Sequence, residues 1–267
     1  MFSSGTTGLP KAVRLTHGNF IAEHTLVFDN PPKPYPISRV VAMPMFHLGA
    51  LPISMIAPFR QGATTYVMRR FEVEPYLKYH EKYSITEMLL VPPMVVSIIM
   101  SPLRKKYSLK SVRLAMCGAA PLGKGPQSRF QALLAPDAPF CQVWGMTETT
   151  SIATMFPWPE NDDTGSIGRP LCNLDTKLVD DDGNDISQPN TRGELCIRGP
   201  TVTLGYFENP EANERDFDEA GFFHTGDIAF VDEKTNLWYI VDRKKVTRLL
   251  SYNVLSMDLL SSTAYGC

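Results

Sequence analysis

As far as about residue 150, segments with two different patterns of hydrophobic and polar positions alternate along the chain. Short runs of apolar and β-branched residues predict strands at 39–43, 64–68, 86–91, 112–117 and 140–143. Segments with apolar residues at helical spacing predict helices at 19–28, 75–83, 92–100 and 126–134. Strands that alternate with helices form a parallel sheet covered on both faces, so this pattern predicts a layered α/β fold.

The pattern changes near residue 157, where helical spacing gives way to short β-like segments. These segments predict strands at 176–179, 194–198, 222–225, 228–231 and 237–241, with turns at 180–183 and 232–236. We expect a smaller β subdomain packed on the α/β part. The predicted organisation is therefore an α/β part at 1–156, a β-rich subdomain at 157–241 and a final segment at 242–267.

Composition and charge narrow the class of protein. The chain has 267 residues, of which 43% are hydrophobic, so it can fill a sizeable core. With 26 basic against 28 acidic residues, it lacks the excess of positive charge that is typical of nucleic-acid-binding proteins. Its five cysteines are irregularly spaced, which indicates neither a zinc site nor a disulfide framework and predicts a reducing compartment. The N-terminus shows no secretory signal.

An uncharged stretch at 40–59 is long enough to suggest a transmembrane segment. Three prolines, a glycine and a histidine interrupt it. A buried strand followed by the start of a helix has the same composition, so we predict no transmembrane segment.

The N-terminal loop combines hydroxyls, glycines and a lysine, a set that suits a polyphosphate. Its members are Ser3, Ser4, Gly5, Thr6, Thr7, Gly8 and Lys11. It is not the Walker pattern, because the lysine follows Pro10 and precedes Ala12. Composition alone favours a solvated loop near a terminus. In order and spacing, however, the run from Ser3 to His17 resembles the phosphate-binding signature of the acyl-adenylate-forming superfamily. That superfamily includes acyl-CoA synthetases, 4-coumarate:CoA ligases, luciferases and the adenylation domains of peptide synthetases.

A second loop, at 142–149, resembles another signature of the same superfamily. The resemblance implies that Trp144 stacks on adenine, Thr147 meets the nucleotide phosphate and Glu148 binds Mg²⁺, with Gln142 also at the nucleotide. A flat indole offers contact area to a purine, Gly145 permits close backbone approach, and a hard carboxylate suits Mg²⁺. By itself the loop could instead place Trp144 in the core and use residues 147–148 as a helix cap.

Four further segments resemble family motifs. Gly118, Ala119 and Ala120 match the small residues that border adenine and the acyl group, and His47 matches a histidine that positions or gates the acyl carboxylate. Taken alone, His47 could be a core residue.

Asp227 matches a carboxylate that accepts hydrogen bonds from the ribose diol, and Arg243 and Lys245 match the start of an interdomain hinge at the nucleotide. Taken alone, Asp227 reads as a turn residue and Arg243 as a surface charge. We interpret the matching segments at 193–195 and 205–206 as structural.

The resemblance implies an AMP-forming acyl- or aryl-CoA ligase. A small carboxylic acid would attack ATP to give an acyl-adenylate, and coenzyme A would then displace AMP. The implied catalytic residues are Lys11, His47, Thr147 and Glu148, with Mg²⁺ as the metal. Three alternatives remain open: an adenylation domain that loads a carrier protein, a luciferase-like oxidative enzyme that shares these motifs, and a nucleotide-binding remnant without turnover. We expect an intracellular protein, cytoplasmic or peroxisomal.

The chain departs from the family pattern in two ways. The family carries a long segment before the phosphate loop and a small C-terminal domain after the hinge, and residues 246–267 leave the expected pattern. We therefore expect a chain truncated at both ends that keeps much of the nucleotide site and turns over slowly or not at all. In addition, Val143 stands where many relatives have glycine, and we hypothesise that it narrows the acyl pocket.

Overall fold

The computed structural model describes residues 1–3, 10–29 and 32–244. A five-stranded sheet forms one half of the molecule, and every neighbouring pair of its strands runs parallel. The strand order is β4-β3-β5-β6-β7, with bounds β3 Ser38–Val41, β4 Thr64–Val67, β5 Glu87–Leu90, β6 Leu114–Cys117 and β7 Phe140–Gln142. The predicted layered α/β fold is confirmed, and each predicted strand of this part is present.

Helices precede and connect these strands. They are α1 His17–Glu23, α2 Ala57–Gln61, α3 Val73–Lys82, α4 Pro92–Met100 and α5 Lys124–Gln131. Short π-helices follow α1 (η1 His24–Asp29) and precede α2 (η2 Pro52–Ile56), and 3-10 turns form η3 Pro102–Lys105 and η4 Thr147–Thr149. Among the described residues no helix is both long and apolar enough to cross a membrane. The uncharged stretch at 40–59 instead forms the end of β3, a loop, η2 and the start of α2.

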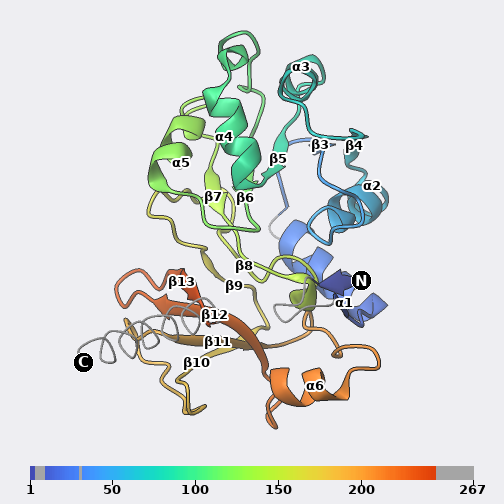
Figure 1. Ribbon diagram of the computed structural model, residues 1–267. Helices are drawn as coiled ribbons and strands as arrows, with labels where there is room; N and C mark the ends of the chain where they lie inside the picture. The colour runs from blue at the N-terminus through green and yellow to red at the C-terminus, as the bar shows by residue number, and fades with distance from the viewer. Residues whose placement is uncertain (4–9, 30–31, 245–267) are drawn as a thin grey trace, which may run out of the picture.

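An antiparallel sheet forms the other half, below the parallel sheet in Figure 1. Its order is β10-β11-β12-β13, with bounds β10 Asp175–Val179, β11 Gly193–Arg198, β12 Phe223–Val231 and β13 Trp238–Arg243. The two strands predicted at 222–225 and 228–231 are wrong as separate elements. They form the single strand β12, in which Gly226 adopts φ +73°. Pairing with β11 continues past this glycine because the register shifts between Glu194 and Cys196.

A short helix, α6 Pro210–Asp216, was not anticipated. Its start carries recognisable signals, because the Asn209 side chain accepts a hydrogen bond from the Ala212 N–H and Pro210 occupies the first turn. This helix contributes to the candidate site.

The N-terminal segment packs on the antiparallel half. Two short strands, β1 Phe2–Ser3 and β2 Lys11–Ala12, pair with each other, and Val13 forms a bridge with Tyr206. Val13 is buried with Leu178 and Leu195 of the antiparallel sheet. Two more strands, β8 Thr154–Met155 and β9 Arg169–Pro170, form a small antiparallel pair. The proposed boundary at residue 157 stays a prediction.

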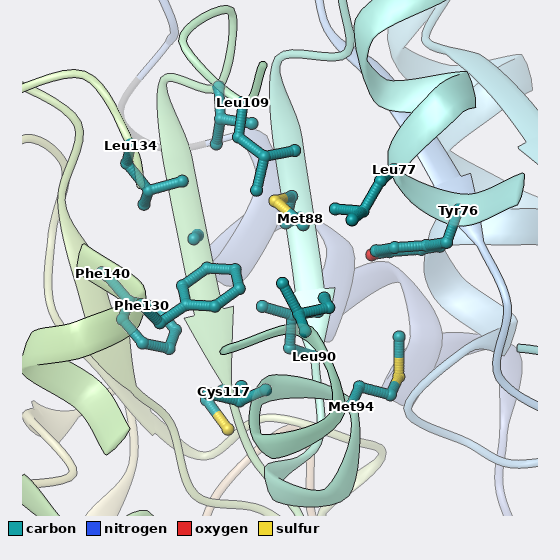
Figure 2. Close-up of a cluster of buried hydrophobic side chains, with 14 of the residues drawn as sticks. Tyr76, Leu77, Met88, Leu90, Met94, Leu109, Cys117, Phe130, Leu134 and Phe140 are labelled. Atoms are coloured by element: carbon teal, nitrogen blue, oxygen red, sulfur yellow. The ribbon is translucent and has the colours of Figure 1, made fainter. Parts of the chain in front are cut away.

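The main core lies between the parallel sheet and helices α3, α4 and α5. Figure 2 shows the side chains of Tyr76, Leu77 and Phe130 directed at the strands that carry Met88, Leu90 and Cys117. Strand β6 is buried along its whole length, as expected for a parallel strand covered on both faces. This packing fixes the carboxyl ends of the strands, where the site forms.

Candidate functional site

A cavity of about 520 Å³ opens at the carboxyl edge of the parallel sheet and is closed on its other side by the antiparallel half. Residues just beyond β3, β5, β6 and β7 line it, together with residues of β11, α6 and β12. Loops at the carboxyl ends of parallel strands usually carry the ligand site of α/β proteins. The position of the cavity therefore follows from the topology.

Eight of the residues singled out from the sequence line this cavity. They are Ser3, Lys11, His47, Gly118, Ala119, Thr147, Glu148 and Arg243. Ala120 is exposed outside the cavity lining, and Gln142, Trp144 and Asp227 are buried behind it. Ser4, Gly5, Thr6, Thr7, Gly8, Lys245 and the divergent tail lie outside the described residues.

Lys11 is held in place by two contacts. Its ammonium lies 2.8 Å from Oδ2 of Asp216 and 4.0 Å from the centre of the Tyr206 ring. Both Asp216 and its neighbour Arg215 line the cavity, yet neither was anticipated from the sequence. The only sequence signal for them was the cap that marks the start of α6.

Tyr206 connects the lysine to the predicted metal ligand. Its hydroxyl donates a hydrogen bond of 2.9 Å to Oε1 of Glu148, and both side chains are buried. Burial, followed by the charge of Glu148, raises the pKa of Tyr206, so its hydroxyl stays protonated and acts as a donor. The sequence had suggested only a structural part for this tyrosine.

Replacing Tyr206 with Phe is expected to lower the free energy of unfolding by about 1–2 kcal/mol, because a buried carboxylate oxygen loses its donor. The variant should also weaken Mg²⁺-dependent ATP binding several-fold, because Glu148 would no longer be held in one orientation. Chemical denaturation and calorimetric titration measure the two effects. Tyr239→Phe is the matched control, since that hydroxyl contacts Thr164 at an exposed position. Equal losses in both variants would contradict the positioning role.

Glu148 and Thr147 lie in the 3-10 turn η4. The capping hydroxyl of this turn belongs to Thr149, which accepts a hydrogen bond from the Met146 N–H at 3.0 Å, so Thr147 is left facing the cavity. The described residues contain no group of three or more His, Cys, Asp or Glu that could hold a metal by themselves. A single carboxylate nevertheless fits Mg²⁺, which is commonly bound by one or two carboxylates together with substrate phosphates and water.

Gly145 is required by the loop itself. A Cβ added at this position would lie 1.6 Å from the carbonyl oxygen of Ser151, because the loop folds back on its own backbone. The sequence had suggested that this glycine leaves room for the nucleotide. The observed close approach is to the chain itself, and it places Thr147 and Glu148 at the cavity wall.

The buried side chains of Trp144 and Asp227 form one hydrogen-bonded unit with the exposed Arg243. The indole Nε1–H donates to Oδ2 of Asp227 at 2.8 Å, and Nε of Arg243 donates to Oδ1 at 2.8 Å. Burial raises the pKa of Asp227, and the charge of Arg243 opposes this. The indole packs in the core of the antiparallel half, which was the alternative reading of Trp144. A carboxylate has about four acceptor positions, so contacts of Asp227 with a ribose, like stacking of Trp144 on adenine, stay predictions.

Gln142 holds a neighbouring loop. Its amide exchanges hydrogen bonds of 2.8 and 2.9 Å with the backbone of Leu122 and donates another of 3.0 Å to Gln127. These contacts tie the segment after β6, which contains Gly118 and Ala119, to the end of β7. Gln142 therefore supports the cavity wall from behind, and its predicted contact with the nucleotide is untested.

His47 is exposed at the cavity and does not belong to the core. Its Nδ1 accepts a hydrogen bond of 3.0 Å from the Gly49 N–H, so the neutral ring carries its proton on Nε2. That proton is available to a carboxylate in the cavity. The predicted positioning role of His47 is consistent with this geometry and stays a prediction.

One end of the cavity is apolar and includes Met43, Leu48, Leu89 and Val143. A Cβ added to Gly118 would lie 3.0 Å from Cγ2 of Val143, so the valine fills the space in front of that glycine. This contact supports the hypothesis that Val143 narrows the acyl pocket.

Replacing Val143 with Gly is expected to enlarge this end of the cavity and to shift the preference toward bulkier acids by about tenfold in kcat/KM. Competition between small and bulky acids in a pyrophosphate-release assay measures the shift. Val67→Gly is a matched control, because this valine lies on the exposed edge strand β4. An unchanged preference would refute the hypothesis.

Glu194, His224 and Lys244 also line the cavity, and we assigned no ligand to them from the sequence. Oε2 of Glu194 accepts a hydrogen bond of 2.9 Å from Nζ of Lys244, and Oε1 accepts one of 3.0 Å from the Gly226 N–H. Burial alone would raise the pKa of Glu194, but the hydrogen bonds from His224 and Lys244 outweigh it and lower the pKa to about 2. Glu194 is therefore ionised at neutral pH and anchors Lys244 at the cavity rim.

A parallel sheet covered by helices, with a cavity at its carboxyl edge that an antiparallel sheet closes, defines the structural class of this protein. Residues 1–207 match the AMP-binding enzyme family. The chain belongs to that family.

Curated relatives are similar in sequence to nearly the whole of this chain. The chain is 53% identical over 247 residues to phenylacetyl-CoA ligase epaB of Aspergillus niger, covering 92% of this chain and 46% of that protein. It is 37% identical over 267 residues to 4-coumarate-CoA ligase 1 of Petroselinum crispum, covering 97% of this chain and 49% of that protein. The chain thus spans about half the length of these relatives.

Solved structures agree with the fold. The chain superposes with a TM-score of 0.79 and 28% identity on the O-succinylbenzoate CoA synthetase of Bacillus subtilis in complex with ATP and magnesium ion, covering 92% of this chain and 50% of that one. The same enzyme with its acyl-adenylate intermediate gives a TM-score of 0.81 at 28% identity, with 92% and 49% coverage.

Proposed function

We propose that this chain carries the nucleotide- and acyl-binding part of an AMP-forming acid–thiol ligase. The observation that carries the proposal is the convergence of eight motif residues, from five separate segments of the chain, on one cavity. The substrates would be a small carboxylic acid, ATP and coenzyme A. In the first step the carboxylate attacks the α-phosphorus of ATP and pyrophosphate leaves. In the second step the sulfur of coenzyme A attacks the acyl carbon and AMP leaves.

The first step depends on charge stabilisation more than on a strong base, since the nucleophile is already an anion. Lys11, Thr147 and Glu148 line the cavity. There Lys11 and Thr147 would contact phosphate oxygens, and Glu148 would hold Mg²⁺. The metal would neutralise part of the phosphate charge. His47, with its proton on Nε2, would orient the carboxylate at the apolar end of the cavity.

Coenzyme A is favoured over a carrier protein as the acceptor because the relatives that match most of this chain are named CoA ligases. The acid is proposed only as a class, a small acid whose apolar body faces the end of the cavity near Val143 and Leu89.

We infer an intracellular location, cytoplasmic or peroxisomal. The four cysteines that the structure describes, Cys117, Cys141, Cys172 and Cys196, all carry free thiols. Free thiols fit a reducing compartment, and both ATP and coenzyme A are intracellular substrates. Imaging of a fluorescent fusion tests this inference, and secretion would refute it.

The decisive experiment is the melting-temperature shift of the purified chain with Mg²⁺-ATP and with a non-hydrolysable acyl-adenylate analogue. Ligand at about a hundred times its dissociation constant should stabilise the fold by roughly 2.7 kcal/mol. Lys11→Ala should reduce the shift, whereas Lys106→Ala should not, because Lys106 forms an exposed ion pair with Glu74. Release of pyrophosphate with a panel of acids then tests turnover. Binding without release would favour the non-catalytic alternative, and absence of binding would refute the proposal.

A further inference from the structure

The proposed phosphate-contacting lysine is already paired with a carboxylate. Nζ of Lys11 lies 2.8 Å from Oδ2 of Asp216, and the two side chains are only 13% and 16% exposed. A pair this shielded is screened by solvent and salt less than a surface ion pair. An incoming polyphosphate must therefore share the ammonium with Asp216 or displace Asp216 from it.

Asp216 also engages a second cation at the cavity. The guanidinium of Arg215 contacts both carboxylate oxygens of Asp216, at 2.7 and 3.0 Å. Burial alone would raise the pKa of Asp216, but the hydrogen bonds from Arg215 and Lys11 lower it, so the carboxylate is ionised at neutral pH. One carboxylate thus neutralises two cations that face the same cavity.

This arrangement is fixed by the fold. The side chain of Asn213 on α6 accepts a hydrogen bond of 2.6 Å from the Tyr206 N–H and donates one of 3.0 Å to the Tyr206 carbonyl. The ring of Tyr206 in turn lies beneath the Lys11 ammonium. Helix α6 is therefore clamped to the residue on which the lysine rests, and Asp216 cannot leave Lys11 by a simple shift of a loop.

The charges at this end of the cavity cancel formally. Lys11 and Arg215 carry positive charge, whereas Asp216 and Glu148 carry negative charge, and all four line the cavity. Mg²⁺ at Glu148 would raise this formal sum to +2, one charge less than it would be without the Asp216 carboxylate. ATP would therefore bind more weakly than the number of cations suggests, and pyrophosphate would leave more readily.

We propose that Asp216 is a positioning residue that competes with the phosphates of ATP for Lys11 and thereby limits the affinity for ATP and pyrophosphate. The inference rests on the proposed function, since it requires the cavity to bind ATP. No contact of Asp216 with the acid is involved, so its removal should act on the nucleotide alone.

The test is calorimetric titration of the chain and its variants with Mg²⁺-ATP and with Mg²⁺-pyrophosphate. Asp216→Asn keeps the size of the side chain and removes its charge, so both ligands should bind about fivefold tighter at low salt. Raising the salt concentration should shrink the gain. Asp216→Glu should restore binding close to that of the unmodified chain. A role in folding alone would weaken binding or leave it unchanged.

Asp218→Asn is the matched control. Asp218 also pairs with a lysine, Lys177 at 2.6 Å, but neither residue lines the cavity. Its removal should not alter the affinity for ATP. In a Lys11→Met background the gain in ATP affinity from Asp216→Asn should fall to about twofold or less. The lysine for which Asp216 and the phosphates compete is absent there.

The outcomes separate this inference from the proposed function. ATP binding by the unmodified chain, with no gain in Asp216→Asn, would refute the inference and leave the function standing. A gain that persists in the Lys11→Met background would also refute it, since Asp216 would then act by direct repulsion. Absence of ATP binding in every variant would refute the proposed function and the inference with it. Binding by Asp216→Asn alone would support both.

Discussion

Replacing Glu148 with Gln is expected to slow formation of the acyl-adenylate by about a hundredfold or more. The carboxylate lies at the cavity wall, and one of its oxygens is held by the Tyr206 hydroxyl. A neutral amide of the same shape keeps the packing but is a poor ligand for Mg²⁺. The loss should therefore fall on the step in which phosphate charge must be neutralised, and the stability of the fold should change little.

Exchange of radiolabelled pyrophosphate into ATP measures this step, and titration of Mg²⁺ at fixed ATP shows whether the metal dependence is lost. Glu160→Gln is the matched control, because Glu160 forms a half-exposed ion pair with Arg169 outside the cavity. That change should alter the exchange rate less than twofold. An exchange rate in Glu148→Gln equal to that of the control would rule out Glu148 as the metal ligand.

The strands and helices of the parallel half could be predicted from the sequence because their burial leaves a strong pattern. Leu114–Cys117 is apolar at every position, and Pro92 starts α4 where the sequence suggests. Such segments are specified locally, by residue type and by proline placement. Helix α6 shows the limit of pattern reading, since it has seven residues and only Ala212 is buried. Its cap was a better signal than its hydrophobic pattern.

The partners within the site could not be predicted, because they come from distant parts of the chain. Lys11 and Asp216 are 205 residues apart, and Trp144 and Asp227 are 83 apart. Motif reading assigned Lys11, Trp144 and Asp227 to the nucleotide, whereas the structure shows each of them bound first to another protein group. A motif indicates which residues gather at a site. It does not indicate which of them neutralise one another there.

Replacing Gly145 with Ala is expected to lower the free energy of unfolding by about 3 kcal/mol or more and to abolish ATP binding. The added Cβ would lie 1.6 Å from the carbonyl oxygen of Ser151 and 2.8 Å from Cα of Ile152. Both contacts are with backbone, which cannot rotate away as a side chain does. The loop must therefore open, and this would displace Thr147 and Glu148 from the cavity.

Urea denaturation measures the loss, and Gly125→Ala is its matched control. Gly125 lies in α5, where an added Cβ meets nothing within 4 Å. Because Gly125 lies in the first turn of α5 and directly before Pro126, the control should change the free energy of unfolding by less than about 1 kcal/mol. Comparing the two variants thus separates two effects of adding a Cβ, the change in backbone freedom, which both variants share, and the clash with the loop, which only Gly145→Ala has. If Gly145→Ala retained the stability and ATP binding of the unmodified chain, the close approach of this loop would not be what holds Glu148 at the site.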